Sequence, residues 1–74
     1  MDIRQKYGAR LKELRLLKKL SQETFAHECG LDRTYIASIE AGKRNLSLIN
    51  IEKISIALGM SVKEFFDKES FREH

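Results

Sequence analysis

Along most of this chain, short apolar segments begin in the same way. An apolar residue precedes a Ser or Asp, and a second apolar residue follows five positions after the first. The four sets are Leu20/Ser21/Phe25, Leu31/Asp32/Ile36, Leu46/Ser47/Ile51 and Met60/Ser61/Phe65. A Ser or Asp at the start of a helix accepts hydrogen bonds from its first amides, and apolar residues at this spacing pack together around that start. The pattern therefore predicts four helices, each beginning directly after its Ser or Asp.

A further helix is predicted before these four, from Asp2 to Lys19. Its apolar stripe follows the helical period at Tyr7, Leu11 and Leu14. Arg10 lies off this stripe, so we expect its side chain in water. Leu16 and Leu17 widen the apolar surface and allow two interpretations. In the first interpretation, one of the two leucines flanks the core and the other is simply exposed. In the second, both belong to a contact surface.

The last two predicted helices complete an all-α, five-helix fold. The fourth covers 48–58, and its core stripe consists of Leu48, Ile51, Ile54 and Leu58. The fifth covers 62–67, with Val62 and Phe65 facing inward. No segment alternates between apolar and polar residues with the period of a strand.

Length and charge limit the class of protein. The 74 residues suffice for one small domain, which we place at 1–74 with its core in 7–66 and a polar tail in 68–74. The net charge is +3, but residues 1–20 hold seven Lys or Arg against two acids, so the excess lies on the first helix. No apolar run is long enough to span a membrane, and the N-terminus lacks the apolar core of a signal peptide. We therefore expect a cytoplasmic protein.

Catalysis and cofactor binding are not indicated. The single cysteine, Cys29, excludes an internal disulfide and is expected to be a small core residue. His27 and Cys29 are two positions apart on one helix, so they face different directions and do not complete a metal site. The chain has no Gly-rich loop for a phosphate-bearing cofactor. We expect no enzyme activity, metal, cofactor or small-molecule ligand.

The predicted second and third helices form a characteristic pair. The first ends near Cys29, and Gly30 suits the left-handed conformation that closes a helix. The next runs from about Arg33 to Ala41, before Gly42. Two short helices joined by a three- or four-residue turn containing Gly are typical of a helix-turn-helix, whose second helix lies in the major groove of DNA. Double-stranded DNA is therefore the expected partner.

The outward face of the third helix carries the candidate base contacts. With Ile36 at the centre of the buried face, Thr34 and Ser38 point the opposite way and Tyr35 flanks them. Residues at the start of a recognition helix contact bases, and Arg to guanine is the commonest specific contact. We predict base contacts by Arg33, Thr34, Tyr35 and Ser38. The alternative is that these side chains are merely solvated on a structural helix.

Phosphate contacts are expected on both sides of that helix. The start of the second helix favours an anion through its free amides and dipole, and it carries Ser21 and Gln22. The loop after Gly42 adds Lys43, Arg44 and Asn45, although basic loops are often only solvated. Phosphate contacts position a protein on the duplex, whereas base contacts specify the sequence.

Glu40 is an acid on the buried face of the third helix, where it needs a partner. Arg15, beside Leu11 and Leu14 on the first helix, is the best available. We predict a partly buried Arg15–Glu40 ion pair that joins the first helix to the third. The alternative is a pair open to solvent, which contributes little to stability.

Between Tyr7 and Phe66 the chain resembles the phage-repressor-like helix-turn-helix family. The motifs that carry the resemblance are L-S-Q-E-x-F-A, G-L-D-R-T-Y-I, I-E-x-G-K-R-N and I-x-x-A-L-G. The resemblance implies a compact five-helix, lambda-repressor-like domain that acts as a dimer on palindromic operators. It also implies that Gln22 binds phosphate and braces the recognition helix, and that Arg15 and Glu40 match the family's buried ion pair.

Within that family, L-D-R-T-Y-I followed by I-E-A-G-K-R-N is similar to the controller proteins of restriction–modification systems. This implies a stand-alone transcription regulator that binds upstream of its own gene and of the endonuclease gene, activating at low occupancy and repressing at high occupancy. In that group, the positions matching Arg33, Thr34 and Tyr35 contact operator DNA, and the loop matching Arg44–Asn45 helps.

The chain departs from the family pattern at the end of the first helix. Lys19 replaces a usual Gly there, so we expect a positive φ at a non-glycine residue. Leu46 replaces a common Pro, which is expected to loosen its loop. A homodimer surface is expected at the start of the fourth helix and on the fifth, from Leu46, Ile49, Met60, Val62 and Phe66.

Two other functions stay open on sequence grounds. An antitoxin-type or other protein-interaction module would use the Leu16/Leu17 face or the 66–71 segment to bind a partner protein. A stand-alone phage-type repressor would share the DNA chemistry of a controller protein and differ in the genes it regulates.

Overall fold

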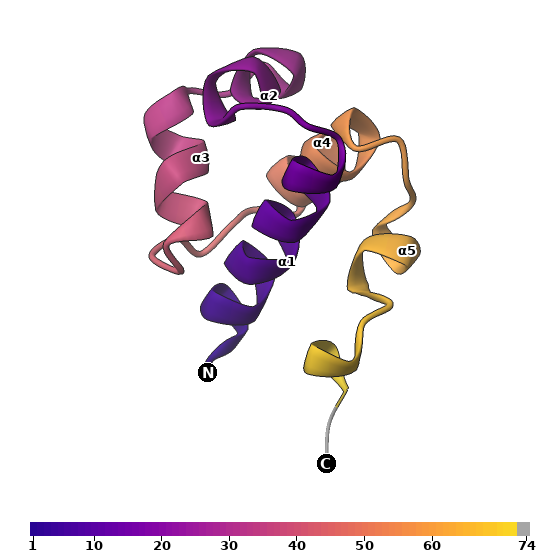
Figure 1. Ribbon diagram of the computed structural model, residues 1–74. Helices are drawn as coiled ribbons and strands as arrows, with labels where there is room; N and C mark the ends of the chain where they lie inside the picture. Colours follow the sequence, from indigo (N-terminus) through magenta and orange to yellow (C-terminus); the bar gives the residue numbers. More distant parts are fainter. Residues whose placement is uncertain (73–74) are drawn as a thin grey trace.

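The computed structural model describes residues 1–72, which fold into five α-helices and one short 3₁₀ helix (Figure 1). The elements are α1 (Ile3–Leu17), α2 (Gln22–Cys29), α3 (Arg33–Glu40), α4 (Leu48–Ala57), α5 (Val62–Phe66) and η1 (Glu69–Phe71). No strand occurs within residues 1–72, and the predicted all-α, five-helix fold is confirmed. The last two residues of the predicted polar tail, 73 and 74, lie outside the described residues.

The four helix starts predicted from the sequence are confirmed. In each case the side-chain oxygen of the predicted cap accepts a hydrogen bond from a backbone amide of the first turn; the caps are Ser21, Asp32, Ser47 and Ser61. At the last of these, the Ser61 amide also donates to the Glu64 carboxylate at 3.0 Å, and this hydrogen bond holds the pKa of Glu64 below its ordinary value. Because these bonds involve residues two or three apart, they form without help from the rest of the fold.

A positive φ angle was expected at Gly30 from its place after the helix and at Lys19 from the family resemblance, and both residues have one. Gly30 closes α2 at φ 69° and its amide donates back to the last turn of that helix. Lys19, after α1, has φ 59°, a conformation that is unfavourable for a side chain with a Cβ atom. The chain therefore accepts local strain at Lys19 to turn from α1 into α2.

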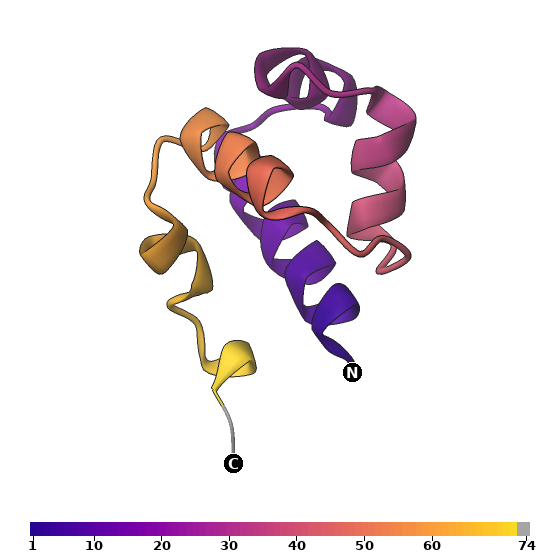
Figure 2. The same ribbon diagram turned by 180° about the vertical axis from the view of Figure 1, so that it is seen from behind.

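The first helix runs through the middle of the molecule and the other helices pack around it. Figure 1 shows α3 on one side of α1 and α5 on the other, and Figure 2 shows α4 in front of α1 from behind. All five helices contribute fully buried side chains to one core: Leu11, Phe25, Ile36, Ile39, Ile54 and Phe65. This shared core fixes the position of α3 relative to the rest of the domain.

A glycine permits the close approach of α1 to α3. A Cβ atom added at Gly8 would overlap the carbonyl oxygen of Ile39 and lie 3.0 Å from that of Glu40. Both are backbone atoms of α3, so they have no freedom to move aside. Gly8 therefore allows α1 to touch the C-terminal end of α3 directly.

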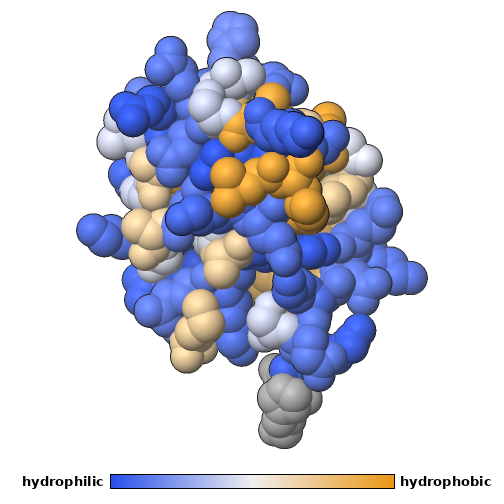
Figure 3. All heavy atoms as spheres, viewed as in Figure 1, coloured by the Kyte–Doolittle hydropathy of each residue, from blue (hydrophilic) through white to orange (hydrophobic). Residues whose placement is uncertain are grey.

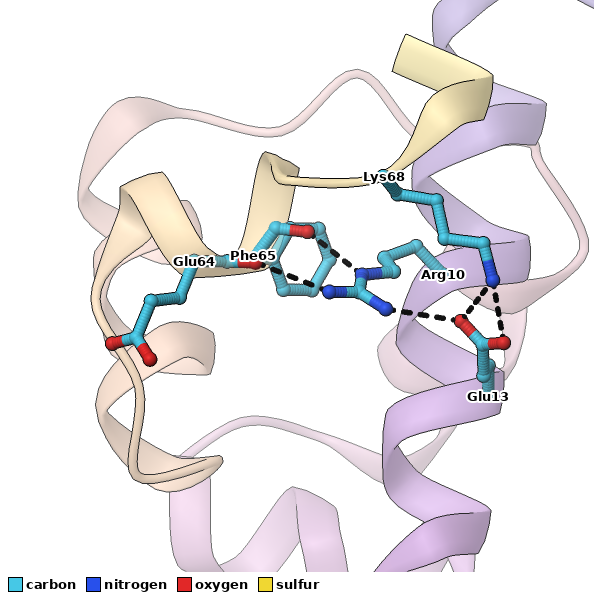
Figure 4. Close-up of polar contacts among 5 residues, drawn as sticks. All are labelled: Arg10, Glu13, Glu64, Phe65 and Lys68. Atoms are coloured by element: carbon cyan, nitrogen blue, oxygen red, sulfur yellow. Dashed lines mark hydrogen bonds and ion pairs between the residues drawn. The ribbon is translucent and has the colours of Figure 1, made fainter.

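The end of α5 is held to α1 by a cluster of polar groups (Figure 4). Arg10 Nε donates to the Phe65 carbonyl at 2.8 Å, and its Nη2 donates to the Glu64 carbonyl at 3.1 Å. Arg10 Nη1 also bonds the Glu13 carboxylate at 3.1 Å, and Lys68 Nζ donates to the same carboxylate at 2.7 Å. The expectation that Arg10 lies in water is wrong, because its spacing on α1 says nothing about carbonyl groups 54 and 55 residues away.

The predicted polar tail packs on the domain through one aromatic side chain. The Phe71 ring lies 4.8 Å from the Phe66 ring, and the Phe65 ring lies 4.5 Å from that of Tyr7. Phe71 is half-buried against the core, whereas the polar residues on either side of it are exposed. The segment 69–71 is therefore a docked 3₁₀ turn, and α1 and α5 provide its support.

Two residues predicted to face the core are exposed instead. Leu48 is 83% exposed and Val62 is 41% exposed. Each is the first residue of its helix, where the side chain stands beyond the packed layer.

Leu16 and Leu17 are also both exposed, at 53% and 73%, so neither is a core residue. Figure 3 shows apolar residues gathered over the C-terminal half of α1, which carries these two leucines. None of the helices within residues 1–72 combines the length and the apolar character that crossing a membrane requires.

Candidate nucleic-acid interface

The helices α2 and α3 stand against each other with α3 open on its outer side. Ile36 and Ile39 bury the inner face of α3 in the core. On the other side, Arg33 and Thr34 are exposed at its start and Ala41 is exposed after its end. The start of this outer face is open to a long polymer such as a duplex, whereas Arg44 lies against Tyr35 and Ser38 further along it.

The orientation of α3 is fixed by a buried junction with α1. Arg15 Nε donates to Glu40 Oε2 at 2.7 Å and its Nη2 donates to Oε1 at 2.9 Å. Their side chains are 7% and 4% exposed, so the predicted Arg15–Glu40 ion pair is present and more deeply buried than expected. The hydrogen bonds to Glu40 raise the pKa of Arg15, and desolvation opposes this effect.

The same junction includes the start of α2. The third donor of Arg15, Nη1, bonds the Leu20 carbonyl at 2.7 Å, and Gln22 Nε2 donates to Glu40 Oε1 at 3.1 Å. Glu40 therefore accepts hydrogen bonds from both α1 and α2 while belonging to α3. A bidentate pair of this kind holds its two partners in a defined relative orientation. The three helices that build the motif meet at this one carboxylate.

An open hollow lies between the start of α2 and the start of α3. Its lining residues are Ser21, Gln22, Glu23, Thr24 and Arg33. Ser21 caps α2, since its hydroxyl accepts from the Thr24 amide at 3.0 Å. The first amides of any helix lack partners within that helix and attract anions. Within residues 1–72, Arg33 makes no ion pair. The hollow thus brings free amides and the Arg33 guanidinium together beside the Glu23 carboxylate, and phosphate binding there stays a prediction.

A second group of contacts lies on the outer face of α3, toward the loop that follows it. Arg44 Nε donates to Ser38 Oγ at 2.9 Å, and the Arg44 guanidinium lies 5.3 Å from the centre of the Tyr35 ring. Ser38 Oγ donates in turn to the Tyr35 carbonyl at 2.9 Å. Asn50 Nδ2, from α4, donates to the Tyr35 hydroxyl at 3.1 Å. Neither the Arg44–Ser38 contact nor the role of Asn50 was anticipated, and no sequence signal marks either one.

The remaining predicted DNA-contacting residues surround this face. Lys43 and Asn45 are exposed in the loop between α3 and α4. Thr34 is exposed, and its amide donates to the cap Asp32 at 2.7 Å. Together with Arg33 and Arg44, these residues give the α3 side of the molecule three cations.

The predicted dimer residues fall into two groups. Ile49 is 68% exposed and Val62 is also exposed, whereas Leu46, Met60 and Phe66 are half-buried against the core of their own chain. Ile56 is exposed on α4 as well. Exposed apolar side chains are thus present on α4 and α5, and the dimer contact stays a prediction.

Burial shifts the pKa of two titratable core residues. Cys29 is buried, and this burial raises the pKa of its thiol to about 11. The Tyr7 hydroxyl is buried as well, which raises its pKa. Within residues 1–72, no group of three or more His, Cys, Asp or Glu side chains is placed to hold a metal ion.

Comparison with known proteins agrees with this geometry. The family model described as helix-turn-helix matches residues 11–65, which is most of the chain. The protein therefore belongs to the helix-turn-helix family.

Within that family, the chain is similar to controller proteins of restriction–modification systems. It is 56% identical over 66 residues to the control protein C.MunI of Mycoplasma sp, and the match covers 88% of this chain and 89% of that one. It also resembles the crystal structure of the restriction–modification controller protein C.AhdI from Aeromonas hydrophila. That match has a TM-score of 0.82 at 51% identity and covers 85% of this chain and 96% of that chain.

A second similar structure was determined with DNA. It is the tetramer of the controller protein C.Esp1396I in complex with its natural 35-base-pair operator. The match has a TM-score of 0.84 at 37% identity and covers 90% of this chain and 88% of that chain. The predicted resemblance to the phage-repressor-like family and to its controller proteins is confirmed.

Proposed function

We propose that this protein is a sequence-specific DNA-binding transcription regulator that controls a restriction–modification system. The observation that carries the proposal is the exposed start of α3, a helix held in a defined orientation by Arg15, Glu40 and Gln22. A helix of eight residues with exposed Arg33 and Thr34 at its start is suited to enter a major groove and present these side chains to base edges. The similarity to C.MunI, C.AhdI and C.Esp1396I supports the restriction–modification context.

The proposed division of roles follows from where the residues lie. Arg33, exposed at the start of α3, reads a guanine, and Thr34 contacts a base edge or a thymine methyl group. Tyr35 flanks these two contacts. Phosphate groups bind at the hollow at the start of α2 on one side and at Lys43 and Asn45 on the other.

We further propose that the protein acts as a homodimer on a palindromic operator. The exposed apolar residues Ile49 and Val62 provide a surface that a second copy would cover. Two recognition helices related by a dimer axis would reach half-sites about one helical turn, or ~34 Å, apart. The operator-bound tetramer of C.Esp1396I shows that a similar protein binds DNA as more than one copy.

The test is a gel shift with the DNA directly upstream of this protein's own start codon. Under the proposal, wild-type protein retards this fragment in preference to a scrambled duplex. Arg33→Ala should weaken binding by about 1–3 kcal/mol and relax the preference at one base pair. Lys63→Ala, which removes an exposed cation from α5, serves as the control and should leave the preference unchanged.

Equal retardation of the upstream and scrambled duplexes would contradict sequence-specific binding. A sequence preference unaffected by Arg33→Ala would contradict the role of that residue. Two successive shifted bands would support binding at paired sites.

A protein-interaction function is a second candidate because Leu16 and Leu17 are both exposed on α1. If this face binds a protein partner, such as a toxin encoded next to it, Leu16→Ser/Leu17→Ser should abolish that association and leave DNA binding intact. If DNA binding is lost while the fold is kept, the two leucines serve the DNA function instead. A phage-type repressor would behave like a controller protein in all these assays and would differ only in the genes next to its operator.

A further inference from the structure

Arg44 does not extend from its loop into water but folds back onto the recognition helix. Its Nε atom donates to Ser38 Oγ at 2.9 Å, six residues earlier in the chain. Its guanidinium carbon lies 5.3 Å from the centre of the Tyr35 ring. Arg44 is an exposed residue, yet its side chain is held at two points. An exposed arginine without such contacts samples many rotamers.

The hydroxyl of Ser38 is oriented to hold this arginine. It has a single proton, which it donates to the Tyr35 carbonyl at 2.9 Å, so its lone pairs face outward and accept from Arg44. The Tyr35 ring is itself fixed, because its hydroxyl accepts from Asn50 of α4 at 3.1 Å. The guanidinium therefore rests on a ring and a hydroxyl that α3 and α4 both keep in place.

The remaining donors of Arg44 are free. Its Nη1 and Nη2 atoms make no hydrogen bond within residues 1–72, while Nε is occupied by Ser38. A planar guanidinium with two terminal donors free matches a pair of acceptor oxygens or a guanine O6/N7 edge. Its position over Tyr35 puts these donors beside the outer face of α3 rather than out in the loop.

We propose that Ser38 is a positioning residue that presets Arg44 for a two-acceptor contact with DNA, and that it does not itself read a base. The inference rests on the proposed DNA-binding function. Ser38 restricts the Arg44 side chain before binding, so less freedom is lost when the guanidinium meets its acceptors. The acceptors are either a guanine edge or phosphate oxygens, and the experiment separates the two.

The test is a double-mutant cycle on a fluorescent duplex that wild-type protein selects from a randomised pool. Ser38→Ala keeps a good helix former on α3 and should weaken affinity by about three- to tenfold. Arg44→Ala should weaken affinity by about five- to hundredfold. Because Ser38 acts through Arg44, adding Ser38→Ala to Arg44→Ala should change affinity by less than about twofold.

Two matched variants complete the cycle. Lys43→Ala removes the neighbouring cation of the same loop. It keeps the backbone hydrogen bond from the Lys43 amide to the Ser38 carbonyl and does not touch the Ser38 hydroxyl, so Ser38→Ala should keep its full effect in that background. Ser38→Thr retains the hydroxyl and should restore affinity to within about twofold of wild type. If Ser38 had a purely structural role, Ser38→Ala would cause the same loss of affinity in the wild-type, Arg44→Ala and Lys43→Ala backgrounds.

The source of the acceptors is read from the same proteins on altered duplexes. If Arg44 contacts a guanine, Arg44→Ala and Ser38→Ala both lose discrimination at the same base pair. If Arg44 contacts phosphate, both variants weaken binding to all duplexes evenly. Arg44→Ala then also lowers the salt dependence of the affinity by about one charge.

The inference is overturned if the effects of Ser38→Ala and Arg44→Ala multiply, or if Ser38→Ala leaves affinity unchanged. If either result is found while Arg33→Ala still weakens binding to the selected duplex, only this inference is refuted. If the wild-type protein enriches no sequence from the pool, the proposed function is wrong and the inference falls with it.

Discussion

Two arginines on α1 make the same kind of contact in different surroundings. Arg15 donates to the Glu40 carboxylate and to the Leu20 carbonyl. Arg10, five residues earlier, donates to the Glu13 carboxylate and to two carbonyl groups at the end of α5. The Arg15 pair is sealed, with side chains 7% and 4% exposed, whereas Glu13 in the other cluster is 42% exposed. The two clusters therefore differ mainly in how much water reaches the carboxylate.

Because of this difference, the Arg15–Glu40 junction fixes the position of α3, whereas the Arg10 cluster only holds the C-terminal segment against α1. In the buried junction, water does not replace a lost partner, so both charges depend on each other. In the Arg10 cluster, water solvates Glu13 and Lys68 if their ion pair opens, so the pair itself contributes little. The recognition helix is attached through the first kind of contact, and the C-terminal segment through the second.

The largest expected effect is at the buried junction. Glu40→Ala leaves Arg15 buried without its counter-charge and removes an acceptor from Gln22, so it should lower the free energy of unfolding by about 3–5 kcal/mol. Urea unfolding followed by circular dichroism measures this. Glu52→Ala removes an exposed carboxylate from α4 and should have almost no effect.

A replacement of both charges sharpens the comparison. Arg15→Met/Glu40→Leu should recover most of the stability lost in Glu40→Ala, since an apolar pair of similar volume often replaces a buried ion pair without loss. A double variant as unstable as Glu40→Ala would show that the hydrogen bonds to Leu20 and Gln22 dominate the junction.

The second effect is at the Arg10 cluster. Arg10→Ala removes two charge-assisted hydrogen bonds to α5 and should lower the free energy of unfolding by about 1–3 kcal/mol. Arg10→Lys keeps the charge but not the planar fork, so it should restore only part of this stability. Hydrogen exchange should rise selectively in α5 and η1. If hydrogen exchange in α3 rose as much as in α5 and η1, the Arg10 cluster and the Arg15–Glu40 junction would not act separately.

A smaller effect is expected for the exposed ion pair. Lys68→Ala should lower the free energy of unfolding by less than about 1 kcal/mol, because its side chain and that of Glu13 are both more than a third exposed. The difference from wild type should shrink further at high salt, which screens exposed charges. A loss as large as that of Arg10→Ala would mean that Lys68 rather than Arg10 holds the C-terminal segment.

The smallest effect concerns pH. The hydrogen bonds from Lys68 and Arg10 hold the pKa of Glu13 below its ordinary value of 4.5. The stability that Glu13 adds is therefore fully present above that ordinary value and is lost as the pH falls through its lowered pKa. Wild type should exceed Glu13→Gln by a few tenths of a kcal/mol near neutral pH, and the two should converge in acid. A gap that stays constant down to about pH 3 would contradict the cause assigned to this pKa.

Much of the site was predictable because it depends on the helical period of one segment or on two charged residues that need each other. The open face of α3 followed from the position of Ile36 in the helical period, and the Arg15–Glu40 pair followed from an acid on an apolar face opposite an arginine on another. The contact between Arg44 and Ser38 was not predictable, because it depends on how the loop after α3 turns back. The role of Asn50 depends similarly on the crossing of α4 with Tyr35.

The sequence alone determined where the last four α-helices begin. A cap such as Ser21 or Ser61 and its amides lie within three residues, so no distant part of the chain is needed to form them. The same holds for the positive φ at Gly30, whereas the positive φ at Lys19 was expected only from the family resemblance. Tertiary structure decided which periodic residues reach the core and which polar groups meet across helices. Leu48 and Arg10 show this, since one lies beyond the packed layer and the other bonds carbonyl groups on α5. Burial and long-range hydrogen bonds depend on the packing of helices, which no local pattern encodes.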